Sequence, residues 1–77
     1  MARAIVLFRV ESGSEYHVLE DVKRVDGVEE AYIAFGVYDI VAKVYGASLD
    51  TLKEIITDKL RQISKAKSTV TLMLIEE

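Results

Sequence analysis

Apolar and polar residues follow two different periods along the chain, and these periods predict strands and helices in a fixed order. Runs rich in β-branched and aromatic residues are typical of strands, and they span residues 3–10, 28–35, 38–45 and 67–75. Gly36 and Val37 separate the second run from the third. A two-residue loop that starts with glycine favours a type II′ hairpin, because glycine readily adopts the positive φ of the first loop position.

Between the strands, two segments carry apolar residues three and four positions apart, which is the spacing of an amphipathic helix. The first begins near Ser12 and Glu15, which have the S-x-x-E spacing of a capping box, and ends at about Val25. The second covers about Leu49 to Ser64 and follows Ser48, a favoured N-cap residue. Its apolar stripe consists of Leu49, Leu52, Ile55, Ile56, Leu60 and Ile63.

The predicted order is strand, helix, strand, strand, helix, strand. Strand–helix–strand crossovers are right-handed, which places both helices on the same face of the sheet. We therefore predict a ferredoxin-like α+β sandwich of the βαββαβ type, with a four-stranded antiparallel sheet and two helices on one face. Residues 1–77 suffice for a single domain. A chain this short buries only about 60% of its unfolded surface, so disulfides, metals or oligomerisation usually add stability.

Composition removes two of these three sources of stability. The chain has no cysteine, which excludes disulfides and thiolate metal sites, and its single histidine argues against a histidine-based metal site. The net charge of −3, with basic residues spread along the chain, is unlike a nucleic-acid-binding protein. No apolar run approaches the roughly 20 residues of a membrane span, and no signal peptide precedes the first strand, so we expect a cytoplasmic protein. Asn is absent and Gln62 is the only amide side chain, a depletion typical of hot habitats.

Side chains alternate between the two faces of a strand, which allows each face to be predicted. In the last strand the all-apolar set Val70, Leu72 and Leu74 is expected to face the helices, and Thr69, Thr71, Met73 and Ile75 to point away from them. The glycine turn pairs Ala34 with Asp39 and puts Asp39 on the helix-free face. Asp39 is then expected to share that face with the two threonines, Arg9, Tyr32 and Lys43.

This helix-free face is predicted to carry a broad apolar patch made of Ile5, Leu7, Ala34, Val41, Met73 and Ile75. Exposed patches of more than a few hundred Å² usually mark an interface. A second copy is the simplest cover, so we predict a homodimer with its two sheets face to face. Asp39 could bind an ammonium group at the edge of that interface, while threonine hydroxyls and turn amides could bind a carboxylate.

A longer motif surrounds the hairpin. Its pattern V-x-x-A-Y-x-x-x-G-x-Y-D is formed by Val28, Ala31, Tyr32, Gly36, Tyr38 and Asp39, and a T-x-T pair, Thr69 and Thr71, lies in the last strand. With its amphipathic second helix, LDTLKEIITDKLRQI, essentially the whole chain resembles the RAM domain. This domain is the C-terminal effector-binding and oligomerisation module of Lrp/AsnC (feast/famine) transcription regulators.

The resemblance implies a non-enzymatic module without a cofactor, whose dimers assemble into a higher oligomer and bind a small amino acid at a dimer–dimer junction. The implied ligand-binding residues are Gly36, Val37, Tyr38, Asp39, Thr69 and Thr71. No helix-turn-helix precedes the first predicted strand, so we expect a stand-alone RAM module that does not bind nucleic acid or membrane directly. It would modulate transcription through assembly with full-length Lrp/AsnC relatives.

Other interpretations remain open on the residues alone. Asp39 is also typical of a turn carboxylate that accepts hydrogen bonds from local amides, and threonine is a common strand residue. Small dimeric α+β-barrel enzymes, such as monooxygenases and isomerases, use the same order of elements. His17 is the only candidate for their chemistry, and no partner carboxylate can be assigned to it from the sequence. A ligand-free structural assembly protein is the third alternative.

Overall fold

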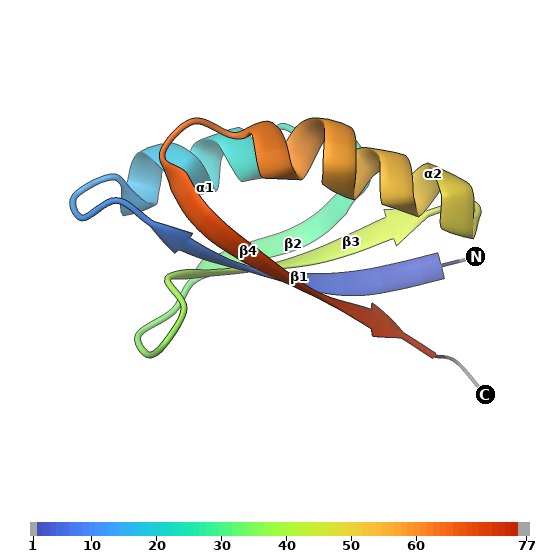
Figure 1. Cartoon of the computed structure of the whole chain (residues 1–77), viewed down its shortest axis with the longest axis horizontal. Helices are drawn as coiled ribbons and strands as arrows, with labels where there is room; N and C mark the ends of the chain where they lie inside the picture. The colour runs from blue at the N-terminus through green and yellow to red at the C-terminus, as the bar shows by residue number, and fades with distance from the viewer. Residues whose placement is uncertain (1, 76–77) are drawn as a thin grey trace.

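A four-stranded sheet is covered on one face by helices in a computed structural model that describes residues 2–75 (Figure 1). The strands are β1 (Ala2–Val10), β2 (Val28–Ile33), β3 (Ile40–Gly46) and β4 (Ala66–Leu74). The helices are α1 (Glu15–Lys23) and α2 (Leu49–Glu54), and α2 continues through a π-helical turn (Ile55–Lys59) and a 3-10 turn (Leu60–Gln62). This order confirms the predicted ferredoxin-like fold. Within residues 2–75, none of the helices is long and apolar enough to cross a membrane.

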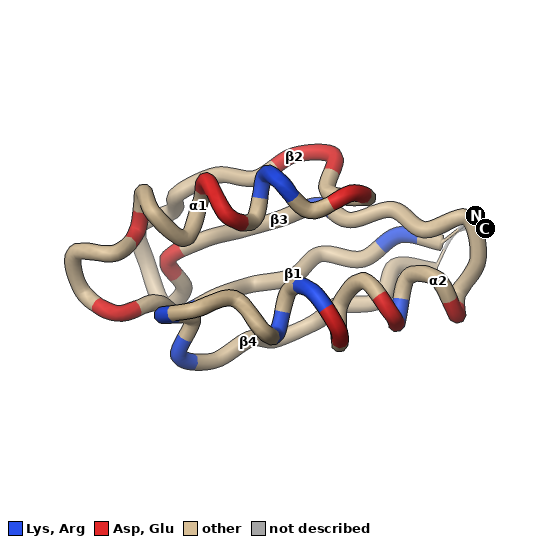
Figure 2. The backbone as a smooth tube through the Cα atoms, turned by 90° about the horizontal axis from the view of Figure 1, so that it is seen from above, with Lys and Arg blue, Asp and Glu red and all other residues tan. Residues whose placement is uncertain are grey.

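The sheet has the order β2-β3-β1-β4, and all neighbouring strands are antiparallel. β1 and β3 are therefore central, and β2 and β4 are the two edges. Helix α1 packs on β2 and β3, α2 packs on β3 and β1, and the 3-10 turn reaches β4. Seen from above, the two helices lie side by side along the sheet (Figure 2).

The hydrophobic core fills the layer between sheet and helices. Alternate residues of the two central strands are buried there, as predicted: Ala4, Val6, Phe8, Val10, Ile40, Ala42 and Val44. Val18, Leu19 and Val22 of the first helix and Leu52, Ile56 and Leu60 of the second helical segment complete the core. Among the residues that the structure describes, none of the buried side chains is polar or charged, so burial of apolar surface dominates the stability.

The two helix starts differ from each other. Ser48 caps α2 as predicted, because its Oγ accepts a hydrogen bond from the Thr51 amide at 3.1 Å. The capping box predicted for Ser12 and Glu15 is wrong. Helix α1 follows Ser14 directly, and Ser14 makes no side-chain capping bond. Glu15 is therefore the first residue of the helix rather than the third, which is where a capping box requires its acidic residue.

The hairpin loop is wider than the predicted two residues. β2 ends at Ile33 and β3 begins at Ile40, and the loop is closed by a hydrogen bond from the Ala34 amide to the Asp39 carbonyl at 2.9 Å. This bond confirms the predicted pairing of Ala34 with Asp39. Gly36 has a φ of 157°, far from the roughly +60° of a type II′ turn, so the predicted turn type is wrong.

The predicted faces of β4 are also wrong. The register places Thr69 opposite Phe8 and Thr71 opposite Val6, so the threonines share the helix-covered face of the sheet. Val70, Leu72 and Leu74 pair with Leu7, Ile5 and Arg3 on the helix-free face. Period-two alternation separates two sets of side chains but does not say which set is covered. Here the pairing with β1 decides, and this pairing includes a register shift between Arg9 and Val10.

Gly46 allows α2 to pass directly over the end of β3. A Cβ atom at Gly46 would lie 2.7 Å from the Leu52 amide nitrogen and 2.8 Å from the Leu52 Cα. Because these are backbone atoms of a helix, they cannot move aside without shifting α2.

We predict that Gly46→Ala lowers the free energy of unfolding by about 1–3 kcal/mol, the usual cost of overpacking. Urea denaturation at one fixed protein concentration measures the loss, since oligomerisation makes stability depend on concentration. Ala47→Ser, at the exposed next position, is the control and should stay within about 0.5 kcal/mol of the parent. Equal stability of Gly46→Ala and the parent would contradict the close helix–strand approach.

Candidate functional site

Asp39 joins the hairpin loop to the end of β1. Its amide donates a hydrogen bond to the Phe8 carbonyl at 2.8 Å, and its Oδ2 accepts one from the Val10 amide at 2.9 Å. The side chain is half-buried, and Val10 is only 6% exposed. The carboxylate therefore satisfies a buried backbone donor just beyond the point where the β1–β3 ladder stops. Within the described residues, Oδ1 accepts no hydrogen bond and remains available as an acceptor.

The rest of the hairpin loop projects from the sheet as an apolar tip. Phe35 is 101% exposed and Val37 is 72% exposed, whereas Tyr38 is half-buried. The loop bends away from the helices, toward the open face of the sheet (Figure 1). Two exposed apolar side chains on one protruding loop are typical of a contact surface rather than of a packed core.

The two threonines do not join the hairpin residues in one cavity of a single chain. Thr69 and Asp39 lie at the same end of the sheet, on opposite sides of β1, because both are neighbours of Phe8. Thr71 lies further along β4 and lines a cavity of about 220 Å³ against the second helical segment, and none of the four hairpin residues lines this cavity. The predicted common face of Asp39, Thr69 and Thr71 is therefore wrong, because the threonines face the helices.

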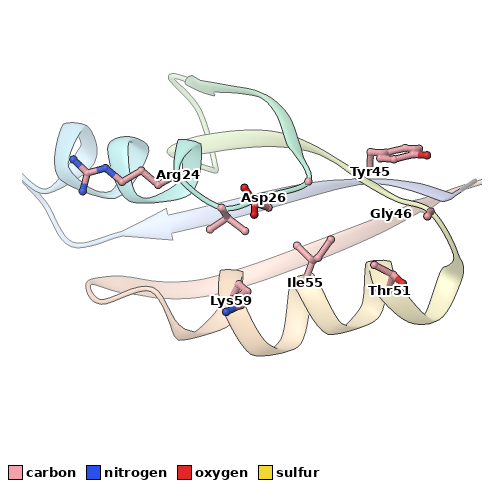
Figure 3. A pocket seen from close by; sticks show the side chains of 10 residues that line it. Arg24, Asp26, Tyr45, Gly46, Thr51, Ile55 and Lys59 are labelled. Atoms are coloured by element: carbon pink, nitrogen blue, oxygen red, sulfur yellow. The ribbon is translucent and has the colours of Figure 1, made fainter.

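A larger cavity that the sequence analysis did not predict lies between the α1–β2 connection and α2 (Figure 3). Its volume of about 630 Å³ falls in the range of small-ligand pockets. Figure 3 shows Ile55 pointing into it and the ring of Tyr45 pointing away from α2. In the sequence, only Gly27 and Gly46 indicated this cavity. A Cβ atom at Gly27 would clash with Ile55, and a Cβ atom at Gly46 would clash with Leu52. The remaining lining residues are Arg24, Val25, Asp26, Ala47, Thr51 and Lys59.

The helix-free face has an apolar centre and a polar rim on the β2 side. The centre consists of Ile5, Leu7, Val41, Val70, Leu72 and Leu74. At the rim, the Tyr32 hydroxyl donates a hydrogen bond to Glu30 at 2.7 Å, and this bond together with the Glu30 charge raises the pKa of Tyr32 above 10.0. Arg3 lies over the Tyr45 ring at 5.2 Å and pairs with Glu29 at 3.1 Å. An apolar centre within a polar rim is the usual layout of a protein–protein interface.

His17 lies on the outer surface of α1. Contrary to the sequence analysis, it has a carboxylate neighbour, since its Nε2 lies 3.5 Å from Asp21 Oδ2 one helical turn away. The His17 side chain is 65% exposed and lines none of the cavities described above. A solvated pair on a convex helix surface lacks the enclosed environment that acid–base catalysis requires.

Comparison with known proteins identifies the relatives of this chain. The family model of the Lrp/AsnC ligand-binding domain matches residues 3–77. An uncharacterized HTH-type transcriptional regulator from Pyrococcus furiosus is 34% identical over 73 residues, and the match covers 91% of this chain and 49% of that protein. The chain spans about half the length of the curated relatives that it matches. The Pyrococcus relatives fit the expected hot habitat.

Solved structures agree with this assignment. A hypothetical protein from Pyrococcus horikoshii has a TM-score of 0.91 and 34% sequence identity, and the match covers 100% of this chain and 93% of that one. AsnC from E. coli has a TM-score of 0.89 and 27% identity, and the match covers 99% of this chain and 52% of that one. The family resemblance expected from the hairpin motif is therefore confirmed.

We predict that Asp39→Ala lowers the free energy of unfolding by about 2 kcal/mol, because the Val10 amide is left buried without an acceptor. Asp39→Asn keeps a carbonyl oxygen at the same position and should lose only about 1 kcal/mol, the difference between a charged and a neutral acceptor. Urea denaturation compares both variants with the parent. If Asp39→Ala were as stable as the parent, the hydrogen bond would have no structural role.

Proposed function

The chain belongs to the family of Lrp/AsnC ligand-binding domains, and from this premise we propose that it is an amino-acid-sensing oligomerisation module. It forms a homodimer through the helix-free face of its sheet, and the dimers assemble further. It binds a small amino acid between dimers and carries out no catalysis. The proposal uses the fold, the exposed sheet face and the hairpin loop, each in a separate role.

The observation that carries the proposal is the apolar sheet face that no helix covers. Leu72 is 49% exposed, Leu74 is 42% exposed and Val70 is 37% exposed, although all three extend the apolar centre formed by β1 and β3. Contiguous exposed apolar surface of this kind is rare on monomers and common at interfaces. The corrected β4 register supports the dimer more strongly than the predicted one, because a complete apolar strand face joins the patch.

The proposed ligand site is built from more than one copy of the chain. Asp39 Oδ1 takes the ammonium group of the amino acid, and the backbone amides of Gly36, Val37 and Tyr38 take its carboxylate. Thr69 and Thr71 face the helices, so they reach this ligand only from another copy. A site that is incomplete in one chain explains why the hairpin residues line no cavity with the threonines. It also couples ligand binding to assembly, since each stabilises the other.

Among proteins of the same fold, a transcriptional regulator from Neisseria meningitidis with a TM-score of 0.82 and 10% identity is described as a complex with L-Met. At that identity the likeness concerns the fold alone. It supports the proposal only in that this fold accommodates an amino acid.

We propose an indirect role in transcription. The relatives are about twice as long as this chain and are named HTH-type regulators. The chain acts in the cytoplasm as an assembly module and associates with full-length relatives through the same sheet face. The acidic net charge of −3 favours this route over direct DNA contact.

Isothermal titration against the twenty amino acids tests the ligand site. We expect heat of binding from at least one small amino acid, and loss of that heat in Asp39→Asn, which removes the negative charge but keeps the hydrogen bond to Val10. Lys43→Gln, a charge change elsewhere on the sheet, is the control and should bind like the parent. If the parent gave no heat of binding with any of the twenty amino acids, this result would count against the ligand site and leave the dimer proposal intact.

Sedimentation equilibrium tests the dimer. We expect Leu7→Lys to dissociate it at micromolar concentration, because a charge at the centre of the contact loses its hydration without gaining a partner. Tyr16→Lys, on the outer face of α1 where Tyr16 is 78% exposed, is the matched control and should remain dimeric. A monomeric parent at the same concentration would refute the interface.

A further inference from the structure

The two edge strands of the sheet differ greatly in how well they are protected against pairing with a further strand. β2 spans six residues, has a register shift between Val28 and Glu30, and carries Glu29 and Glu30. Short length, irregular pairing and charge are the usual means of blocking further strand pairing at an edge. β4 spans nine residues, and its register with β1 is unbroken from Leu74 to Ser68. Figure 2 shows the contrast, with acidic residues along the β2 edge.

The open edge of β4 carries no charge over most of its length. Residues 68–74, STVTLML, are uncharged, β-favouring and free of proline, and Lys65 and Lys67 precede them. A long edge strand without charge is a template for another strand, because its outward N–H and C=O groups are unpaired.

This uncharged stretch is self-complementary when two copies run antiparallel about its midpoint, Thr71. Such pairing sets Ser68 opposite Leu74, Thr69 opposite Met73, Val70 opposite Leu72, and Thr71 opposite its own copy. Residues directly opposite in an antiparallel pair share a face, so apolar side chains of the helix-free face stay together. Both Lys67 side chains fall outside the uncharged stretch, and no like charges meet.

Thr71 supplies an independent reason to place the two-fold axis there. Among the described residues, Thr71 Oγ1 is the only buried side-chain oxygen or nitrogen without a hydrogen-bond partner. Cβ atoms of directly opposite residues lie about 4.5–5.5 Å apart, within reach of a threonine–threonine hydrogen bond. In the assembly without amino acid, a second copy of Thr71 therefore brings a hydroxyl next to this one.

The cations beside β4 do not oppose this contact. Lys53 and Arg61 line the small cavity next to Thr71. Lys53 belongs to α2, which packs on β1 and β3, whereas Arg61 belongs to the 3-10 turn that reaches β4. The β1 strands of two edge-paired copies are about 14 Å apart, three strand spacings. Lys53 and Arg61 are both exposed in the single chain, on the helix side of the sheet rather than in line with the strand edge.

We infer that β4 is a second self-association surface, at which two copies pair their β4 edges antiparallel about Thr71 to form one continuous sheet. The contact rests on the proposed higher assembly but uses a different surface from the sheet-face dimer. A molecule with two distinct two-fold contacts builds closed rings or chains of dimers, so this edge joins one dimer to the next.

Cross-linking tests the register. The chain contains no cysteine, so Thr71→Cys introduces a single thiol whose copy lies directly opposite, within the Cα separation that a disulfide bridges. Mild oxidation should give a two-chain band on a non-reducing gel for Thr71→Cys. Thr69→Cys, whose counterpart is Met73 rather than itself, should stay a single chain. The double variant Leu7→Lys, Thr71→Cys should still cross-link, which separates the edge from the sheet face.

A charge exchange tests the contact without a covalent bond. Thr69→Glu with Met73→Glu places like charges opposite each other across the edge, whereas Thr69→Lys with Met73→Glu places opposite charges there. Both pairs lie on the helix-covered face and leave the sheet-face contact unchanged. Native mass spectrometry should show only dimers for the first variant and larger assemblies for the second.

Three outcomes would overturn the inference without bearing on the sheet-face dimer or on the role of Asp39. One is a Thr71→Cys variant that remains a single chain. Another is identical assembly of the two charge-exchange variants. The third is that β4 binds an extended acidic peptide in solution but never a second copy of the chain. In that case the β4 edge would pair with a strand of another protein.

Discussion

The whole structure depends on one imbalance, since a single sheet is apolar on both faces and helices cover only one of them. The covered face packs Phe8, Ile40 and their neighbours against the helices, and this layer alone forms the core. The other face also carries apolar strand residues, but these are in contact with water. Among residues 2–75, no further helix or strand covers it. The described residues therefore form one packed layer pair and leave the other sheet face open for the proposed partner copy.

In the proposed site, Asp39 would serve both the fold and the ligand. One carboxylate oxygen holds the end of β1 through the Val10 amide, which fixes the side chain in place. The second oxygen is then held at a defined position without extra ordering cost on binding, which is the advantage of a preorganised group. The structural and ligand-binding interpretations of Asp39 are for this reason compatible.

The sequence predicted the elements and the fold because periodicity and helix signals agree along most of the chain. Alternation in β1 and β3 predicted the core correctly, since both central strands are buried on one side by long apolar residues. The prediction of the β4 faces failed, because alternation along a strand does not show which of its two faces the helices cover. Thr69, Thr71 and Leu72 alternate cleanly, but which set is covered depends on how β4 pairs with β1. The large cavity was missed because Gly27 and Gly46 mark close backbone approach, and their significance appears only once α2 is in position.

The pairing of the first strand with the last has a consequence for how the molecule forms. Arg3 lies opposite Leu74, so nearly the entire chain separates two neighbouring positions in the sheet. Contacts this distant in sequence form late and slow the folding of small domains. During synthesis, β1 therefore keeps one edge unpaired until residues 66–74 have left the exit tunnel. Nascent chains on neighbouring ribosomes thus expose matching strand edges for the same interval, when assembly and aggregation compete most directly.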